Sequence, residues 1–372
     1  MLKPSAINLA GVVLLLFCIG AGCTQSTASP ELAAEQDATR FVSFSVERPT
    51  RVVGDTFTEI DSLGRPGDLL KVGPYLVISD GHNDPPLHIV RASDGTLIQS
   101  LGRPGEGPGE FGSIWSLLSA PTEDEAFWAY DVMLRRLTYV DLKRYFADAF
   151  TLGEQLISLT SEGMLISPAW IADTLIIGSG FFTEGRIGHF DSSGKMLRQV
   201  GITPPGRKKV PVPVRQHAYQ STLATHPDGS LAVLGTRHAD QLEIYRVDGT
   251  RLVVVRGPLE FDPIYTVKNR GGAPSMATGD DLRFGFIDLA TTQKYIFALY
   301  SGRTREDYPG RANFGETVHV FDWSGQLIHT YQLDADVISI VVDESGRTLY
   351  ASQRPHPAIL SYALTDHEKD PL

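Results

Sequence analysis

The chain has 372 residues, of which 42% are hydrophobic and 21% are charged, and its formal net charge is −11. This composition is that of a folded globular protein, and the negative charge argues against a general nucleic-acid binder, because neutralising phosphates needs a basic surface. The length exceeds the size at which one hydrophobic core stops growing, so the chain forms either two domains or one repeating array. No linker divides it after residue 41, which favours the array.

The N-terminus has the pattern of a signal peptide. Lys3 precedes an apolar stretch at 7–19, which is shorter than the roughly 20 apolar residues that span a bilayer. Gly20-Ala21-Gly22-Cys23 follows and resembles the lipobox of bacterial lipoproteins, although Gly20 stands where that pattern prefers Leu. The resemblance implies that residues 1–22 are a lipoprotein signal peptide and that Cys23 is lipidated. Ordinary secretory cleavage beside an incidental cysteine is the alternative.

The residues after Cys23 carry two further implications. Thr24 stands where an Asp would resemble an inner-membrane retention signal, so the resemblance points to the outer membrane of the bacterial cell envelope. Cys18 would leave with the signal peptide, so the mature chain would have no free thiol for a disulfide, a zinc site or a nucleophile. Residues 24–37 are small, polar and acidic, and we expect 23–40 to be a flexible tether.

A repeat marks the start of the folded part. Leu-Gly-Arg-Pro-Gly occurs at Leu63–Gly67 and again at Leu101–Gly105, 38 residues later. The residues before the two copies, Thr58–Ser62 and 96–100, also match in type. An identical pentapeptide at this spacing indicates a repeat architecture, and each copy is typical of a strand that runs into a Gly/Pro turn.

Downstream of residue 41 the sequence alternates short apolar strands with turn residues. An alternating strand, a tight Asp/Gly turn and a second alternating strand recur, which is the strongest short-range signal for a β-hairpin. We expect each hairpin to form the outer half of a four-stranded unit whose inner two strands precede it, and counting these units gives six. The hairpin turns lie at 94–95, 141, 191–194, 248–249 and 322–325.

The final unit lacks one strand. Its inner pair is followed only by Ala358–Leu364, and the repeat alignment supplies Thr58–Ser62 as the missing partner. A shared sheet between the two ends would close the array and remove its exposed edges. The sequence therefore predicts an all-β, six-bladed β-propeller over 41–364, its ring closed by an N-terminal strand joining the last blade, with a polar C-terminal tail at 365–372.

Two stretches carry a family resemblance. Residues 101–111 (LGRPGEGPGEF) resemble the blade junction of NHL-type propellers. Residues 282–364 include FIDLATTQKYIFALYSGR and VHVFDWSGQLIHTYQLD, and they resemble the TolB-like six-bladed propeller lipoproteins of bacteria. The resemblance implies a six-bladed propeller placed in the periplasm or at the cell surface, and it implies no particular activity.

The long connections of such a propeller collect on one face, and loops carry function more often than the scaffold does. The Lys, Arg, Asp and Glu residues of these loops give a net charge of +1, whereas the whole chain has −11. A mildly basic face on an acidic body would attract small anions or acidic glycans. The candidate ligand-binding residues lie where inner strands meet these loops, and they are Arg215, His217, Arg237, Arg303 and Arg354.

Other candidates have competing interpretations. The basic run Arg207-Lys208-Lys209 belongs either to the binding face or to a solvated loop tip. Asp80, Asn83 and Asp84 offer oxygen ligands of the kind that calcium-dependent propeller lactonases use, but Asp84-Pro85-Pro86 more readily fits a turn. The candidates for stacking on a sugar ring are Trp115 and Phe181–Phe182, although aromatic residues of a β fold usually lie in the core.

No catalytic motif stands out: the glycine-rich run 105–109 lacks the Lys-Ser/Thr of a phosphate loop, and the histidines have no metal-ligand spacing. We therefore expect no cofactor and no metal, and no catalytic residue is named. The favoured function is a lipid-anchored module that binds a glycan, a peptide or a partner protein through its long-loop face, without nucleic-acid partners. The alternative is a metal-dependent hydrolase or lyase with its site at the mouth of the channel.

Overall fold

The computed structural model describes residues 39–365 and 367, except 47, 82 and 205–209. Strands dominate this part of the chain, which confirms the prediction of an all-β fold. This described part contains two short α-helices, α2 (Leu142–Phe146) and α3 (Val212–Ala218). Within the described residues, no helix has the length and apolar character needed to cross a membrane.

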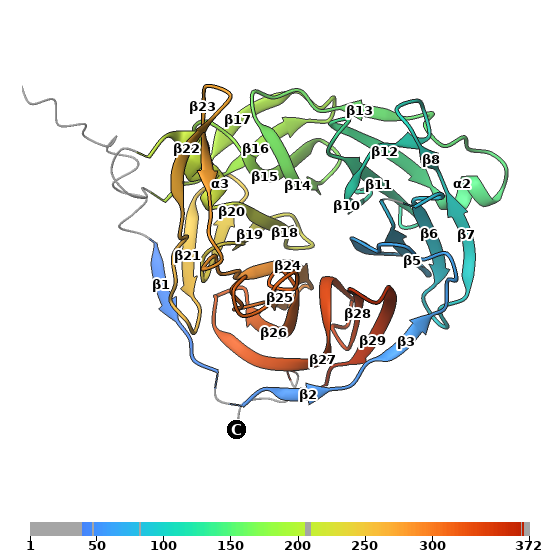
Figure 1. Cartoon of the computed structure of the whole chain (residues 1–372). Helices are drawn as coiled ribbons and strands as arrows, with labels where there is room; N and C mark the ends of the chain where they lie inside the picture. The colour runs from blue at the N-terminus through green and yellow to red at the C-terminus, as the bar shows by residue number, and fades with distance from the viewer. Residues whose placement is uncertain (1–38, 47, 82, 205–209, 366, 368–372) are drawn as a thin grey trace, which may run out of the picture. The chain divides into compact units, whose positions relative to one another are not determined.

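Most strands form antiparallel four-stranded units that we call blades 1 to 6, arranged around a common centre in Figure 1. Blade 1 contains β4 (Leu69–Val72), β5 (Tyr75–Ser79), β6 (Leu87–Arg91) and β7 (Leu97–Leu101). Blade 2 contains β10 (Ile114–Ser119), β11 (Ala126–Asp131), β12 (Arg136–Asp141) and β13 (Leu156–Ser158). Blade 3 contains β14 (Met164–Ile171), β15 (Leu175–Phe181), β16 (Ile187–Asp191) and β17 (Met196–Val200).

Blade 4 contains β18 (Ser221–Thr225), β19 (Leu231–Thr236), β20 (Gln241–Arg246) and β21 (Arg251–Arg256). Blade 5 contains β24 (Phe286–Thr291), β25 (Tyr295–Tyr300), β26 (Gly315–Asp322) and the first half of β27 (Leu327–Val342). Blade 6 continues from the second half of β27 into β28 (Thr348–Gln353) and β29 (Ala358–Ala363). Because β27 belongs to two blades, these blades form one eight-stranded sheet, while the other sheets are separate and none closes on itself.

The N-terminal strands follow the outer rim of blades 4 to 6 (Figure 1). Two of them add in parallel to an outer strand, β1 (Arg40–Ser43) to β21 and β2 (Thr50–Val52) to β27. The third, β3 (Asp55–Thr58), pairs antiparallel with β29, so that Thr56 lies opposite Leu360. The sequence prediction placed this strand at Thr58–Ser62, which is too far along the chain. Ile60 and Leu63 instead pack into the hydrophobic cluster between blades 1 and 6.

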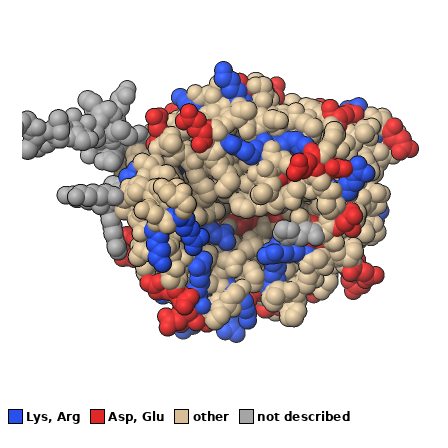
Figure 2. Space-filling model, turned by 45° about the horizontal axis from the view of Figure 1, so that its top comes forward, with Lys and Arg blue, Asp and Glu red and all other residues tan. Residues whose placement is uncertain are grey.

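Long connections gather on one face, which we call the loop face. It carries the loops that join successive blades and those that join the second and third strands within a blade. Figure 2 looks obliquely onto this face and shows it hollowed near its middle, with Lys and Arg side chains beside the hollow. The loops contain structure that the sequence analysis missed: α3 precedes blade 4, and a hairpin of β22 (Thr266–Arg270) and β23 (Ala273–Ala277) precedes blade 5.

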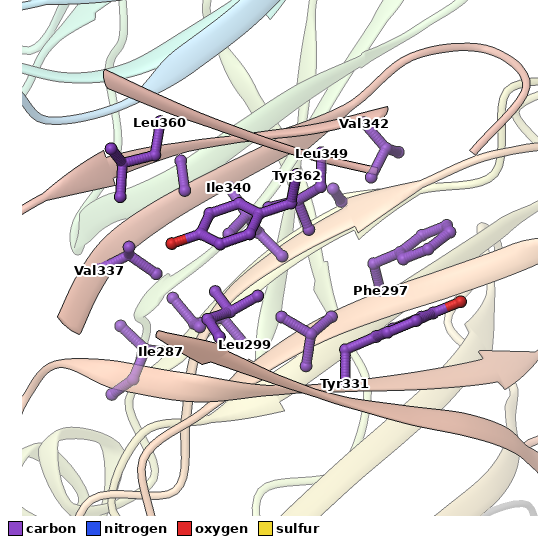
Figure 3. Packing of buried hydrophobic residues seen from close by; sticks show 14 of the residues in the cluster. Ile287, Phe297, Leu299, Tyr331, Val337, Ile340, Val342, Leu349, Leu360 and Tyr362 are labelled. Carbon is purple, nitrogen blue, oxygen red and sulfur yellow. The ribbon is translucent and has the colours of Figure 1, made fainter. Parts of the chain in front are cut away.

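The core consists of the layers between neighbouring blades. The second strand of each blade is covered on both faces, so it is buried along most of its length rather than at alternate positions. In β25, for example, every residue from Ile296 to Tyr300 is buried. Figure 3 shows the layer between blades 5 and 6, where Phe297, Leu299, Tyr331 and Tyr362 are almost completely buried.

A glycine contact between blades 1 and 6 gives a test of the N-terminal strand. Gly95 has a positive φ of 71° in the β6–β7 turn, and a Cβ there would overlap the carbonyl oxygen of Phe57 in β3. The hydroxyl of Thr58 also donates to the Gly95 carbonyl at 2.5 Å. We expect Gly95→Ala to displace β3 and to lower the free energy of unfolding in urea by about 2–4 kcal/mol.

The matched control is Gly271→Ala in the β22–β23 turn, where φ is 59° and no atom lies within 4 Å of the added Cβ. This change adds only backbone strain and should cost about 1 kcal/mol. Equal losses of unfolding free energy in the two variants would show that the contact between β3 and the Gly95 turn does not contribute to stability.

Candidate functional site

The inner strands of all six blades line a central cavity of about 1280 Å³. Its walls come from β4, β10, β14, β18, β24 and the second half of β27, and loop residues line its mouth on the loop face. The cavity extends along these strands to the short turns on the opposite face, where it is bordered by acidic residues such as Asp343 and Glu344. It is the candidate site.

A β-bulge recurs near the loop-face end of the inner strands. It occurs in β10, β14, β24 and β27, and each bulge adds one residue that lines the cavity: Trp115, Ile166, Ile287 and Ile338. A short polar residue follows each bulge: Ser116, Ser167, Asp288 and Ser339. Bulges redirect side chains, and together with Asp68 these four residues form what we call the polar ring, just below the mouth of the cavity.

The polar ring connects neighbouring blades. Asp68, just before β4, accepts a hydrogen bond from the Leu117 amide of blade 2 at 2.7 Å. Ser167 of blade 3 donates to the Leu223 carbonyl of blade 4 at 3.2 Å. Asp288 of blade 5 accepts from the Ile340 amide of blade 6 at 2.8 Å. These bonds satisfy main-chain groups of inner strands that have no sheet partner on that side.

Two carboxyl groups of the ring are close together. The Ser339 hydroxyl lies 3.2 Å from Asp68 Oδ1 and 2.7 Å from Asp288 Oδ2. Burial, together with repulsion by Asp288, raises the pKa of Asp68 to about 7. Burial likewise raises the pKa of Asp288 to about 6, although its hydrogen bonds and Arg237 oppose this. Neither carboxyl group stood out in the sequence, because Asp68 directly precedes an apolar strand and Asp288 is a single polar position within one.

Two of the five predicted ligand-binding residues line the cavity, Arg237 and Arg354. Arg237 follows β19 and its guanidinium lies 5.5 Å from the centre of the Phe284 ring. It makes no ion pair and no side-chain hydrogen bond with any described residue. Arg354 follows β28 and donates to the Pro66 carbonyl at 2.9 Å. Arg65, which was not among the predicted residues, is exposed at the same mouth.

The other three predicted residues lie elsewhere on the loop face, outside the cavity lining. Arg303 is 6% exposed, because it pairs with Asp336 at 2.6 Å and Glu316 at 2.9 Å. Arg215 and His217 lie on α3, where the exposed His217 contacts the ring of Phe181. The basic run Arg207-Lys208-Lys209 lies outside the described residues.

One candidate aromatic residue lines the cavity. Trp115 is the bulge residue of β10, it lines the cavity, and it remains 46% exposed. A large aromatic side chain that stays exposed in a cavity offers its face to a ligand. Phe182, in contrast, is 1% exposed and belongs to the core between blades 2 and 3.

The acidic loop at 80–84 anchors the chain. Asp80 is fully buried, and its carboxylate accepts from the Gly64 amide at 2.7 Å and the Arg65 amide at 2.6 Å. Burial would raise the pKa of Asp80, but hydrogen bonds from His88, Gly64 and Arg65 outweigh it and lower this pKa. Its oxygens therefore hold the first LGRPG segment. Asp131 and Asp240 anchor later blade junctions through main-chain amides in the same way.

No group of three or more His, Cys, Asp or Glu side chains within the described ranges could hold a metal ion. Asn83 donates to Asp80 at 3.0 Å, and Asp84 is exposed, with its amide donating to Asn83. The three candidate calcium ligands thus form a turn rather than a convergent site.

The raised pKa values predict how stability depends on pH. A carboxyl group whose pKa is higher in the folded protein than in the unfolded chain stabilises the fold when protonated, and this contribution is lost as pH rises through about 7. We expect Asp68→Asn to raise the urea-unfolding free energy at pH 8 by roughly 1–2 kcal/mol, and to weaken its pH dependence between 6 and 8. The exposed turn variant Asp173→Asn should change neither quantity. An unchanged pH dependence in Asp68→Asn would contradict the assignment.

Comparisons with known proteins give a family and a fold. The family model described as TolB-like 6-blade propeller-like matches residues 46–345. Among solved structures, the beta-propeller domain of Myceliophteria thermophila Cps50 (Swd1) is similar, with 11% identity and a TM-score of 0.49. That alignment covers 84% of this chain and 100% of the other. A comparison with curated proteins found no match.

The family match extends from the N-terminal strands to the turn before β28 and so covers most of the described blades. It confirms the resemblance that the sequence indicated. The chain belongs to the TolB-like 6-blade propeller-like family.

Proposed function

We propose that the protein is a binding module, whose ligand enters the central cavity from the loop face and places an anionic group against Arg237. The observation that carries this proposal is a guanidinium group in the cavity wall that no described carboxylate pairs with. The propeller fold is consistent with a binding or interaction module. The pocket supplies the concave, partly polar setting in which ligands are usually bound.

The favoured anion is a carboxylate or sulfate. Guanidinium groups present their N–H donors in a fork that matches the two oxygens of such groups. The position of Arg237 is also supported by a cation–π contact with the ring of Phe284. Arg65 and Arg354 add positive charge at the mouth, so an anion would be drawn in from the loop face.

The favoured ligand class is an acidic glycan. Trp115 is exposed within the cavity and offers a flat face on which a sugar ring can stack. Short hydroxyl side chains such as Ser116 and Ser339 border the same space and are suited to sugar hydroxyls. Binding of an acidic peptide or a partner protein, with no affinity for sugars, is the other outcome of the test.

Ring closure belongs to the same proposal. The pairing of β3 with β29 and the packing of β3 on the Gly95 turn support a ring that the N-terminal strand closes. A closed ring keeps the six inner strands at fixed separations, so the cavity is formed before the ligand arrives. Preorganisation of this kind lowers the entropic cost of binding.

We further propose that Cys23 is lipidated and anchors the propeller to the membrane, in the outer membrane of the cell envelope. The support is the sequence alone: the apolar stretch at 7–19 and the small residues Gly20-Ala21-Gly22 before the cysteine. These residues lie outside the described part of the chain.

Binding can be tested with D-glucuronate, an acidic sugar, by isothermal titration calorimetry. We expect Arg237→Met to weaken binding about tenfold or more, because it removes the charge-assisted hydrogen bonds and keeps much of the side-chain volume. Trp115→Ala should weaken it by a similar factor through loss of stacking. Raising the salt concentration should weaken wild-type binding, because partly exposed charges are screened.

The matched control is Arg246→Met, which makes the same chemical change on an exposed arginine at the opposite face. It should leave affinity unchanged. Equal loss in Arg246→Met and Arg237→Met, with both variants folded, would contradict a site in the cavity. Glucose, the neutral counterpart of the probe, should bind more weakly than glucuronate.

Membrane anchoring is tested by Cys23→Ser in cells that process lipoproteins. The expected result is a shift of the protein from the detergent-dependent membrane fraction to the soluble fraction, because the acyl chains can no longer be attached. Retention in the membrane fraction with an unchanged N-terminus would overturn the anchor.

A further inference from the structure

We propose that Asp68, Ser339 and Asp288 form a proton-binding site in the cavity wall, and that an anion bound beside Arg237 brings a proton with it. This inference rests on the proposed function, because it concerns the same cavity. It adds a regulatory property, because the affinity for the ligand would depend on pH.

The hydrogen-bond geometry offers a position for one proton. The Ser339 oxygen lies within hydrogen-bond distance of two carboxyl groups, 3.2 Å from Asp68 Oδ1 and 2.7 Å from Asp288 Oδ2. A serine hydroxyl has one hydrogen, so it can donate to only one ionised carboxylate. The second contact becomes a hydrogen bond when the other acid is protonated and donates to the serine oxygen. A single proton then completes the chain from Asp68 through Ser339 to Asp288.

The other hydrogen bonds of the two acids indicate which of them holds the proton. Asp288 Oδ2 receives both the shorter serine contact and the Ile340 amide at 2.8 Å, so it is the better-supported anion. Asp68 Oδ2 accepts from the Leu117 amide and Oδ1 accepts from the Leu69 amide at 3.0 Å; Oδ1 is the oxygen that faces Ser339, so it would carry the proton. The higher pKa of Asp68, about 7 against about 6 for Asp288, agrees with this assignment. The two groups titrate as a pair.

The charged surroundings of the pair are simple. Arg237 is the charge that acts on Asp288 from the β19–β20 connection. Arg65 and Arg354 lie at the mouth, and Lys71 lies further along β4. The other inner strands, β10, β14 and β18, contribute no titratable side chain. His226, Asp228, Asp343 and Glu344 border the cavity at its opposite end.

Coupling follows from these positions. At high pH both carboxylates are charged, and they repel an incoming anion and compete with it for Arg237. An anion at Arg237 stabilises the protonated form of the pair, which raises its pKa and causes proton uptake. By linkage, the same anion must bind more tightly when the pair is already protonated. Affinity therefore rises as pH falls from 8 through 7 to 6.

The experiment is calorimetric titration with D-glucuronate, which stays ionised between pH 6 and pH 8. Titrations in two buffers of different ionisation enthalpy count the protons taken up. We expect binding about fivefold tighter at pH 6 than at pH 8, the part of the tenfold limit of one unit of pKa shift that falls in this range. We also expect net proton uptake near pH 7, and binding weakened about tenfold or more in Arg237→Met.

Variants separate the pair from other titrating groups. Asp68→Asn should bind at pH 8 nearly as tightly as the wild type does at pH 6, with little pH dependence and little proton uptake. Asp288→Asn should also tighten binding at pH 8 and reduce its pH dependence. The inference can therefore be tested even if one of the two variants folds poorly. Glu344→Gln makes the same charge change at the opposite end of the cavity, and it should keep the wild-type pH dependence.

The outcomes distinguish this inference from the function on which it rests. Absence of glucuronate binding at both pH values would overturn the proposed acidic-glycan site and the coupling together. Binding that needs Arg237 but has equal strength at pH 6 and pH 8, without proton uptake, would overturn the coupling alone. A pH dependence that persists in both Asn variants would assign it to a different group and overturn the pair.

Discussion

One recurrent hydrogen bond holds the wall of the cavity, and it runs from a short polar side chain on one inner strand to the main chain of the next blade. Inner strands have a sheet partner on one side only, so their other main-chain groups need partners from outside the sheet. Asp68, Ser167 and Asp288 supply them across three of the junctions. The bulge before Ser167 and Asp288 sets the direction of these side chains. The stability of the ring and the polarity of the cavity thus have a common origin.

The sequence was most informative where main-chain geometry restricts residue choice. Tight turns between strands demand Gly and Asp, so the hairpins and the LGRPG repeat could be found, and with them the number of units. The polar ring follows a pattern too: Ile114-Trp115-Ser116 resembles Leu165-Ile166-Ser167 and Phe286-Ile287-Asp288. A pattern of two apolar residues followed by one polar residue is too common in sequences to indicate a site. The bulge can be recognised only when the register of the paired strands is known.

The candidate site was only partly predictable, because long-range partners decide what a charged residue does. Arg237, Arg303 and Arg354 all follow a second strand of a blade, so each was placed at the loop face. Asp336, 33 residues further along the chain, forms an ion pair with Arg303, whereas Arg237 has no ion-pair partner among the described residues. Strands β1 and β2 escaped prediction for a similar reason: they depend on parallel pairing with strands about 200 or more residues away.

The residue types in the polar ring bear on whether it serves structure alone. Ser167 makes its inter-blade contact with a hydroxyl, so a serine is sufficient for this role. Asp68 and Asp288 make the equivalent contacts with carboxyl groups, and both of them adjoin Ser339. Burial raises both pKa values, so the two acids oppose folding at neutral pH relative to a neutral residue. A neutral side chain could make the same contacts without this cost in stability. Destabilising residues of this kind are found most often at functional sites, so we infer that the charge of the two acids has a function. On the proposed function, the bound anion is what this charge acts on, because the pair lies in the cavity wall within the electrostatic reach of Arg237.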